Sequence, residues 1–168
     1  MTEIFGVPAQ ALFGQLLIGL INGSFYALLS LGLAVIFGLL NIINFTHGAQ
    51  YMLGAFFAYF LLHKAGLGYW WSLAIAPLAS GAFGMLIERT MLRQLYKLDH
   101  LYGLLLTFGL ALMIEGLFRD LYGVAGQPYS IPEEFAGAFN LGFMFLPKYR
   151  AWVVVASLTV CLATWYMI

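Results

Sequence analysis

The feature that most constrains this chain is a long stretch without charge. From Ile4 to His63 the sequence contains no Asp, Glu, Lys or Arg, and its one clear polar break is Asn41–Gly48, here called the polar island. A water-soluble domain could not cover its surface with such a segment. The chain is therefore predicted to be an integral membrane protein, in which the polar island departs from an ordinary lipid-facing helix.

Composition supports the membrane class and excludes several functions. Hydrophobic residues make up 63% of the chain and charged residues 8%, against about 45–50% and about 25% in an ordinary soluble domain. The formal net charge is +0, so no basic surface is available for nucleic acid.

Cys161 is the sole cysteine and is predicted to be a packing residue, with no disulfide or metal site. The chain has no His-Glu-x-x-His or Gly-x-Ser-x-Gly motif, so we predict no catalytic residue and no cofactor.

The pattern of apolar runs predicts an all-α, polytopic transmembrane helical bundle. Small residues recur at near-fourfold spacing in the first run, at Gly19, Gly23 and Ala27, and such spacing favours one long tilted helix with a close-packing face. A break near Asn22–Ser24 is the alternative. About five membrane segments are expected, one of them discontinuous around the polar island: Ala9–Leu40, Ala49–Leu62, Tyr69–Ile87, Leu101–Tyr122 and Ala151–Ile168.

The polar island and the short segment after it are typical of a discontinuous transmembrane helix. Backbone freed at membrane depth is tolerated where it is buried in protein or lines a water-filled cavity. Two interpretations stay open on the residues alone. The island lines a pathway, or it forms a tight turn between helices in which Asn side chains cap helix ends.

Two charged sites bear on orientation and function. The segment Glu88–His100 carries Arg89, Arg93 and Lys97 at fourfold spacing, and basic loops beside membrane spans are retained in the cytoplasm. Gly123–Arg150, the longest polar segment, then lies outside. Within the span Leu101–Tyr122, Glu115 and Arg119 are one turn apart and are predicted to form an intramembrane ion pair rather than a proton relay.

Several motifs together resemble the LivH-type permease family of bacterial branched-chain amino acid ABC importers. The most specific is Asn44-Phe45-Thr46-His47-Gly48, within Gly38–Gly48. The resemblance extends over essentially the whole chain through four further matches: Asn22–Leu28, Tyr51–Ala55, Ile87–Arg89 and Leu104–Leu110.

The resemblance implies a subunit of the bacterial inner membrane with a periplasmic N-terminus. Its partners would be a homologous LivM-like permease, two cytoplasmic ATPases and a periplasmic binding protein for an amino-acid solute. The chain carries no Gly-x-x-x-x-Gly-Lys-Ser/Thr pattern, so the partner subunits are expected to handle ATP. The translocation pathway would be lined or braced by Asn41, Asn44, Thr46 and His47. Close helix packing would use Gly23, Gly48 and Gly54.

The resemblance also raises the question of length and of alternative functions. Members of the family are close to twice as long and carry a later cytoplasmic loop that docks on the ATPase. We therefore expect residues 1–168 to form one transmembrane permease domain, truncated at the C-terminal end. Urea or a short amide is the alternative solute, and a non-transporting scaffold or fragment is the alternative class.

Overall fold

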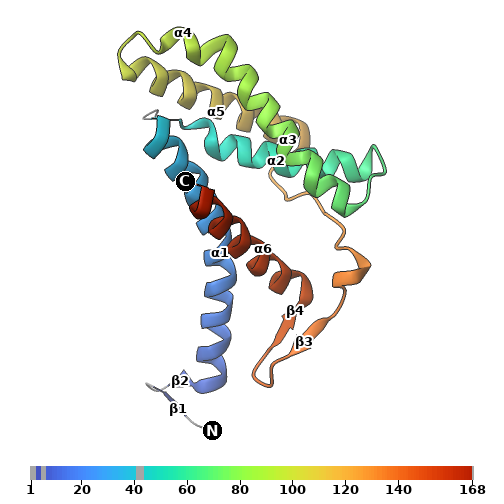
Figure 1. Cartoon of the computed structure of the whole chain (residues 1–168). Coiled ribbons are helices and arrows are strands. Elements are labelled where there is room, and N and C mark those ends of the chain that lie inside the picture. Colours follow the sequence, from blue (N-terminus) through green and yellow to red (C-terminus); the bar gives the residue numbers. More distant parts are fainter. Residues whose placement is uncertain (1–2, 5–6, 41–43, 168) are drawn as a thin grey trace. The chain divides into compact units, whose positions relative to one another are not determined.

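A computed structural model describes residues 3–4, 7–40 and 44–167 of the chain. The chain divides into two compact units (Figure 1). Unit 1 combines the N-terminal Met1–Leu31 with the C-terminal Ile131–Ile168, and unit 2 is the continuous segment Gly32–Ser130. The long helix α1, Ala9–Leu40, contributes residues to both units.

Unit 2 is built around a short helix. This helix, α2, spans Thr46–His63 and packs against both α3 and α5. α3 spans Tyr69–Ile87 and continues through a π-helical turn, η1 (Glu88–Leu92), into the short α4 (Arg93–Leu95). α5 spans His100–Tyr122. The predicted segments Tyr69–Ile87 and Leu101–Tyr122 therefore match α3 and α5 to within one residue at each end.

Unit 1 contains the first part of α1, the helix α6 and two small hairpins. α6 spans Lys148–Met167 and follows the 3₁₀ turn η2, Glu133–Phe135. One antiparallel hairpin pairs β1 (Glu3–Ile4) with β2 (Val7–Pro8), and the other pairs β3 (Ala138–Asn140) with β4 (Phe145–Pro147).

The β3–β4 hairpin was not predicted from the sequence, although its turn has a recognisable signal. Gly142 has a φ of 81°, a left-handed conformation that glycine adopts without steric cost. Its N–H donates to Asn140 Oδ1 at 2.9 Å, and the Leu141 N–H donates to the Met144 carbonyl at 3.0 Å. An Asn-x-Gly turn between two apolar strands is thus closed locally.

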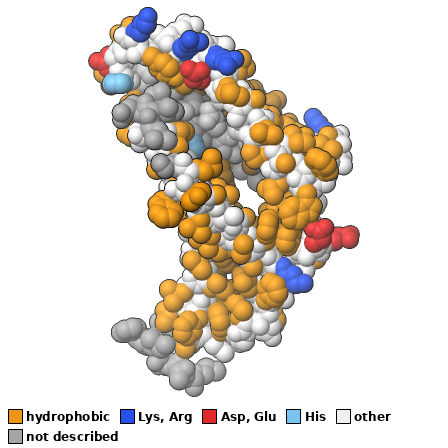
Figure 2. Space-filling model, viewed as in Figure 1, with side chains coloured by type: hydrophobic (Ala, Val, Ile, Leu, Met, Phe, Trp, Pro, Cys, Tyr) orange, Lys and Arg blue, Asp and Glu red, His pale blue; other side chains and the backbone are white. Residues whose placement is uncertain are grey.

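Among the described residues, four helical stretches are long and apolar enough to cross a membrane: α1, Tyr69–Leu95, α5 and α6. The prediction of an all-α membrane bundle is confirmed, and so is one uninterrupted helix over Ala9–Leu40. The fifth expected segment is α2, whose 18 residues are not among the four. Hydrophobic side chains cover much of the visible surface (Figure 2), as expected of helices that face lipid.

The basic segment is more ordered than the predicted loop over Glu88–His100. Glu88–Leu95 is helical and continues α3, because Glu, Arg, Met, Leu and Gln favour helix. Side chains reinforce it: the Thr90 hydroxyl donates to the Leu86 carbonyl at 2.6 Å, and Gln94 Nε2 donates to the Thr90 carbonyl at 2.8 Å. Basic side chains gather over this extension (Figure 2).

The extension ends in a hydrogen bond between Tyr96 and Glu88. The Tyr96 hydroxyl donates to Glu88 Oε1 at 3.2 Å. Burial first, and then the Glu88 carboxylate, raises the pKa of Tyr96 above its usual value of 10.0. The phenol therefore keeps its proton, and with it the hydrogen bond, throughout the neutral pH range.

α5 begins at a capped residue. Asp99 precedes its first helical residue, and Asp99 Oδ1 accepts the N–H of Leu101 at 2.9 Å. This carboxylate satisfies one of the N–H groups that the start of a helix leaves without an intrahelical partner.

We predict that Asp99→Ala lowers the free energy of unfolding by about 1 kcal/mol, because the helix loses its cap. Asp99→Asn should retain most of the stability, since its side-chain oxygen still accepts the bond. Thermal denaturation followed by circular dichroism in detergent checks both variants. Equal stability of Asp99→Ala and wild type would show that the cap contributes nothing.

Candidate functional site

The described part of the polar island forms the capped start of α2. Asn44 Oδ1 accepts the backbone N–H of Thr46 at 3.0 Å and also the Thr46 hydroxyl. Thr46 has no exposed surface, whereas Asn44 is half-buried. Asn44 thus supplies an acceptor to a helix start inside an apolar environment. Phe45, at the N-cap position, makes no side-chain cap hydrogen bond, so Asn44 caps the helix from one residue further back. Of the two interpretations left open by the sequence, a turn capped by an Asn side chain describes these contacts, and pathway lining stays a prediction.

His47 lies against the backbone of α1. An added Cβ at Gly32 would lie 2.7 Å from His47 Cε1 and 3.0 Å from Nε2. Only glycine at position 32 leaves room for the imidazole in this position, since such distances are far inside van der Waals contact. The half-buried ring therefore holds the start of α2 close to α1 within unit 2.

α2 and α3 meet through small and polar residues spaced one turn apart. The Ser80 hydroxyl donates to the Gln50 carbonyl at 3.0 Å, and Ser80 Cβ lies 3.9 Å from the Cβ position of Gly54. One turn further along α3, a Cβ at Gly84 would lie 3.3 Å from Gln50 Nε2. Residue numbers rise along α2 as they fall along α3, so the two helices are antiparallel. Small side chains and interhelical hydrogen bonds are the means by which helices associate in lipid.

α2 and α5 meet through aromatic rings. The ring pairs advance together along both helices, so α2 and α5 run parallel. Offset and edge-to-face pairs at these distances are attractive beyond the area that they bury. The centroid distances are 6.0 Å for Phe45–Phe108, 4.4 Å for Phe56–Phe118 and 5.7 Å for Phe60–Tyr122.

Glu115 and Arg119 line a groove of about 240 Å³ beside Met52 and Phe56 of α2. Both charged side chains are exposed. The groove brings them together on one face of α5, as their fourfold spacing predicts. No salt bridge joins them in the described part of the chain, so their ion pair stays a prediction.

The remaining predicted residues have mixed outcomes. Asn41 lies outside the described residues. Gly54 lies at a helix contact, whereas an added Cβ at Gly23 or Gly48 would meet no atom of the described chain within 4 Å. The close-packing role of Gly23 and Gly48 therefore stays a prediction. Over residues 3–4, 7–40 and 44–167, no three His, Cys, Asp or Glu side chains are grouped so that they could hold a metal ion.

Sequence reasoning missed Gly32, Gln50, Ser80 and Gly84, which make the close contacts around α2. Ser80 and Gly84 are four residues apart in an apolar span, a spacing that could have marked them. Gly32 carried no such signal, because its importance depends on which side chain meets it.

Comparisons of the sequence with known proteins match it to a transport family. The family model for the permease component of branched-chain amino acid transport systems matches residues 15–168. The chain belongs to this permease family. It is 27% identical over 150 residues to the high-affinity branched-chain amino acid transport system permease protein LivH of Escherichia coli, a match that covers 84% of this chain and 47% of LivH.

Two further relatives carry similar names. The permease protein BraD of Pseudomonas aeruginosa is 34% identical over 76% of this chain and 44% of BraD. The permease protein LivM of Salmonella typhimurium is 32% identical over 64% of this chain and 24% of LivM. This permease chain thus spans less than half the length of these curated relatives. No solved structure matches it. With its apolar helices, this member of the permease family is a multi-pass membrane protein.

We predict that Gly32→Ala destabilises the permease by about 1–3 kcal/mol, the usual cost of overpacking, because the new methyl group collides with the His47 ring. Gly19→Ala is the matched control on the same helix: it meets no described atom within 4 Å and should be neutral or slightly stabilising. Thermal unfolding in detergent measures both. His47→Ala should restore stability to Gly32→Ala, and failure to do so would disprove the contact.

Proposed function

We propose that this chain is part of a membrane permease subunit of an ABC importer for branched-chain amino acids. One observation carries the proposal: a single family model accounts for residues 15–168. The relatives LivH, BraD and LivM are all named for branched-chain amino acid transport, which favours these solutes over urea or short amides.

In this proposal the capped start of α2 contributes to the translocation pathway. Asn44 and His47 are half-buried and can present polar atoms to a passing solute, whereas the fully buried Thr46 braces the turn. Asn41 is assigned to the same pathway from its place in the polar island. A polar break beside a short helix is where transporters commonly place such groups.

The proposed partners are a homologous LivM-like permease, two cytoplasmic ATP-binding subunits and a periplasmic protein that delivers the solute. The family is a permease component of a transport system, so ATP hydrolysis is assigned to the partner subunits. Glu115 and Arg119 are proposed to pair, which would reduce the cost of placing two charges on a membrane span.

The proposed location is the bacterial inner membrane, with the N-terminus in the periplasm. Arg89, Arg93 and Lys97 all lie near or beyond the end of the α3 stretch, and clustered positive charge beside a span favours the cytoplasmic side.

We predict that Lys97→Cys, in a Cys161→Ser background, is labelled by a membrane-impermeant maleimide only when the reagent can reach the cytoplasmic face. Lys97 is exposed and lies in the turn between α4 and α5, so the thiol is accessible from that side alone. Inside-out and right-side-out vesicles measure the difference. Labelling of right-side-out vesicles would reverse the orientation.

We predict that Asn44→Leu in the complete permease lowers the uptake of leucine per permease molecule in the membrane. Asn44→Ser separates the two roles of this residue, because serine caps a helix nearly as well as asparagine but lacks the amide. Both variants should reduce uptake in an assay with radiolabelled leucine. Normal uptake by Asn44→Ser, with a loss only in Asn44→Leu, would reduce Asn44 to a capping residue.

A further inference from the structure

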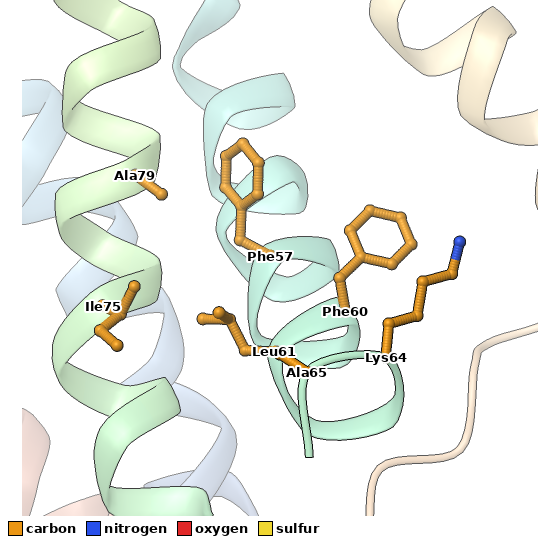
Figure 3. Close-up of a pocket in the computed structure, with 7 residues that line it drawn as sticks. All are labelled: Phe57, Phe60, Leu61, Lys64, Ala65, Ile75 and Ala79. Carbon is orange, nitrogen blue, oxygen red and sulfur yellow. The ribbon is translucent and has the colours of Figure 1, made fainter. Parts of the chain in front are cut away.

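A groove between α2 and α3 lies apart from the polar start of α2. It has a volume of about 330 Å³, within the range of small-ligand sites. Figure 3 shows Phe57 and Leu61 on the side of α2 that faces Ile75 and Ala79 of α3, and Phe60 on the side of α2 away from them. The turn after α2 completes the lining with Lys64 and Ala65. All the lining residues except Lys64 are apolar.

Lys64 is held at the rim of this groove. Its ammonium group lies 5.4 Å from the centre of the Phe60 ring, in the range of a cation–π contact. Figure 3 shows the Lys64 nitrogen beyond the Phe60 ring, away from Ile75 and Ala79. No carboxylate is among the lining residues, so the positive charge has no anionic partner within the groove.

Local backbone structure sets the position of Lys64. The N–H groups of Lys64 and Ala65 both donate to the Phe60 carbonyl, at 2.8 and 3.2 Å, and Leu67 N–H donates to the Leu61 carbonyl at 2.9 Å. Gly66 has a φ of 66°, a left-handed conformation that lets the chain change direction after α2. The end of α2 is thus closed by its own hydrogen bonds, and Lys64 leaves the helix at a defined point.

Aromatic residues indicate that this end of the groove is the one nearer the membrane surface. Trp70 and Trp71, at the start of α3, are 48% and 67% exposed. Tryptophan concentrates where the hydrocarbon meets the headgroups. We therefore expect the Lys64 end of the groove to lie near the headgroups and the part towards Ala79 to lie in the hydrocarbon.

We propose that this groove binds an anionic phospholipid, with one acyl chain along Phe57, Ile75 and Ala79 and the phosphate group on Lys64. The apolar lining suits hydrocarbon, and an ammonium at the rim with no carboxylate in the lining suits a negative headgroup. An amino-acid solute fits less well, because the lining offers no group to bind its ammonium. The proposal does not depend on the transported solute.

The test uses the complete permease complex, purified in detergent and titrated with dioleoyl-phosphatidylglycerol or dioleoyl-phosphatidylethanolamine. Native mass spectrometry counts the bound lipids. Wild type should prefer phosphatidylglycerol, and Lys64→Gln should reduce that preference about fivefold, as expected for one basic residue near the membrane surface. Lys64→Arg should retain it. Arg150→Gln, which removes an exposed charge outside this groove, is the matched control and should change nothing.

The apolar part of the groove is tested separately. Ala79→Leu should weaken the binding of both lipids equally, because the larger side chain fills the space of the acyl chain. An unchanged preference in Lys64→Gln overturns the proposal, and this variant of an exposed residue remains informative if Ala79→Leu does not fold. Efficient cross-linking of Ala79→Cys to the partner permease would also overturn it, since the groove would then be a subunit interface.

Discussion

The arrangement of unit 2 depends on how the backbone N–H groups at the start of α2 find hydrogen-bond acceptors. The first N–H groups of a helix have no intrahelical acceptor, and hydrocarbon supplies none. Asn44 provides that acceptor through one side-chain oxygen, which receives both the backbone N–H and the hydroxyl of Thr46. Because Thr46 is fully buried, loss of this acceptor would leave polar groups without partners in an apolar interior.

Once α2 begins at this point, its two faces determine its neighbours. The ring of His47 needs the bare backbone at Gly32, and the Gln50 side chain lies close to the bare backbone at Gly84. On the side that faces α5 the contact is made by large side chains instead, with Phe56 packed closely on Phe118. Lipid is as apolar as the helix side chains, so burial of apolar surface does not drive helices together in a membrane. The helices of unit 2 instead pack either by close approach at small residues or by large rings that fill the space between them.

The two ends of α2 are chemically distinct. Its start carries Asn44, Thr46 and His47, the last of which lies against Gly32 of α1, and the proposed translocation role belongs there. Its end carries Lys64 at the rim of an apolar groove, and the proposed lipid contact belongs there. A helix of 18 residues thus connects the proposed polar site to the proposed lipid contact. Polar residues such as His47 and Gln50 lower the mean hydropathy of α2, which explains why it is not among the four candidate spans.

The sequence by itself determined the membrane class, the bounds of α3 and α5 to within one residue, and the family, because these follow from uncharged runs, turn residues and a specific local motif. It favoured a continuous α1 but left a break near Asn22–Ser24 open, which the structure then excluded. It also marked Asn44 as a capping candidate, since capping is a local contact between residues two positions apart in the sequence. The contact roles of the glycines were decided only by tertiary structure. Within the described chain Gly32 and Gly84 meet polar side chains while Gly23 and Gly48 meet no atom within 4 Å, because the need for glycine arises from the residue opposite, and the sequence does not state which residues face one another.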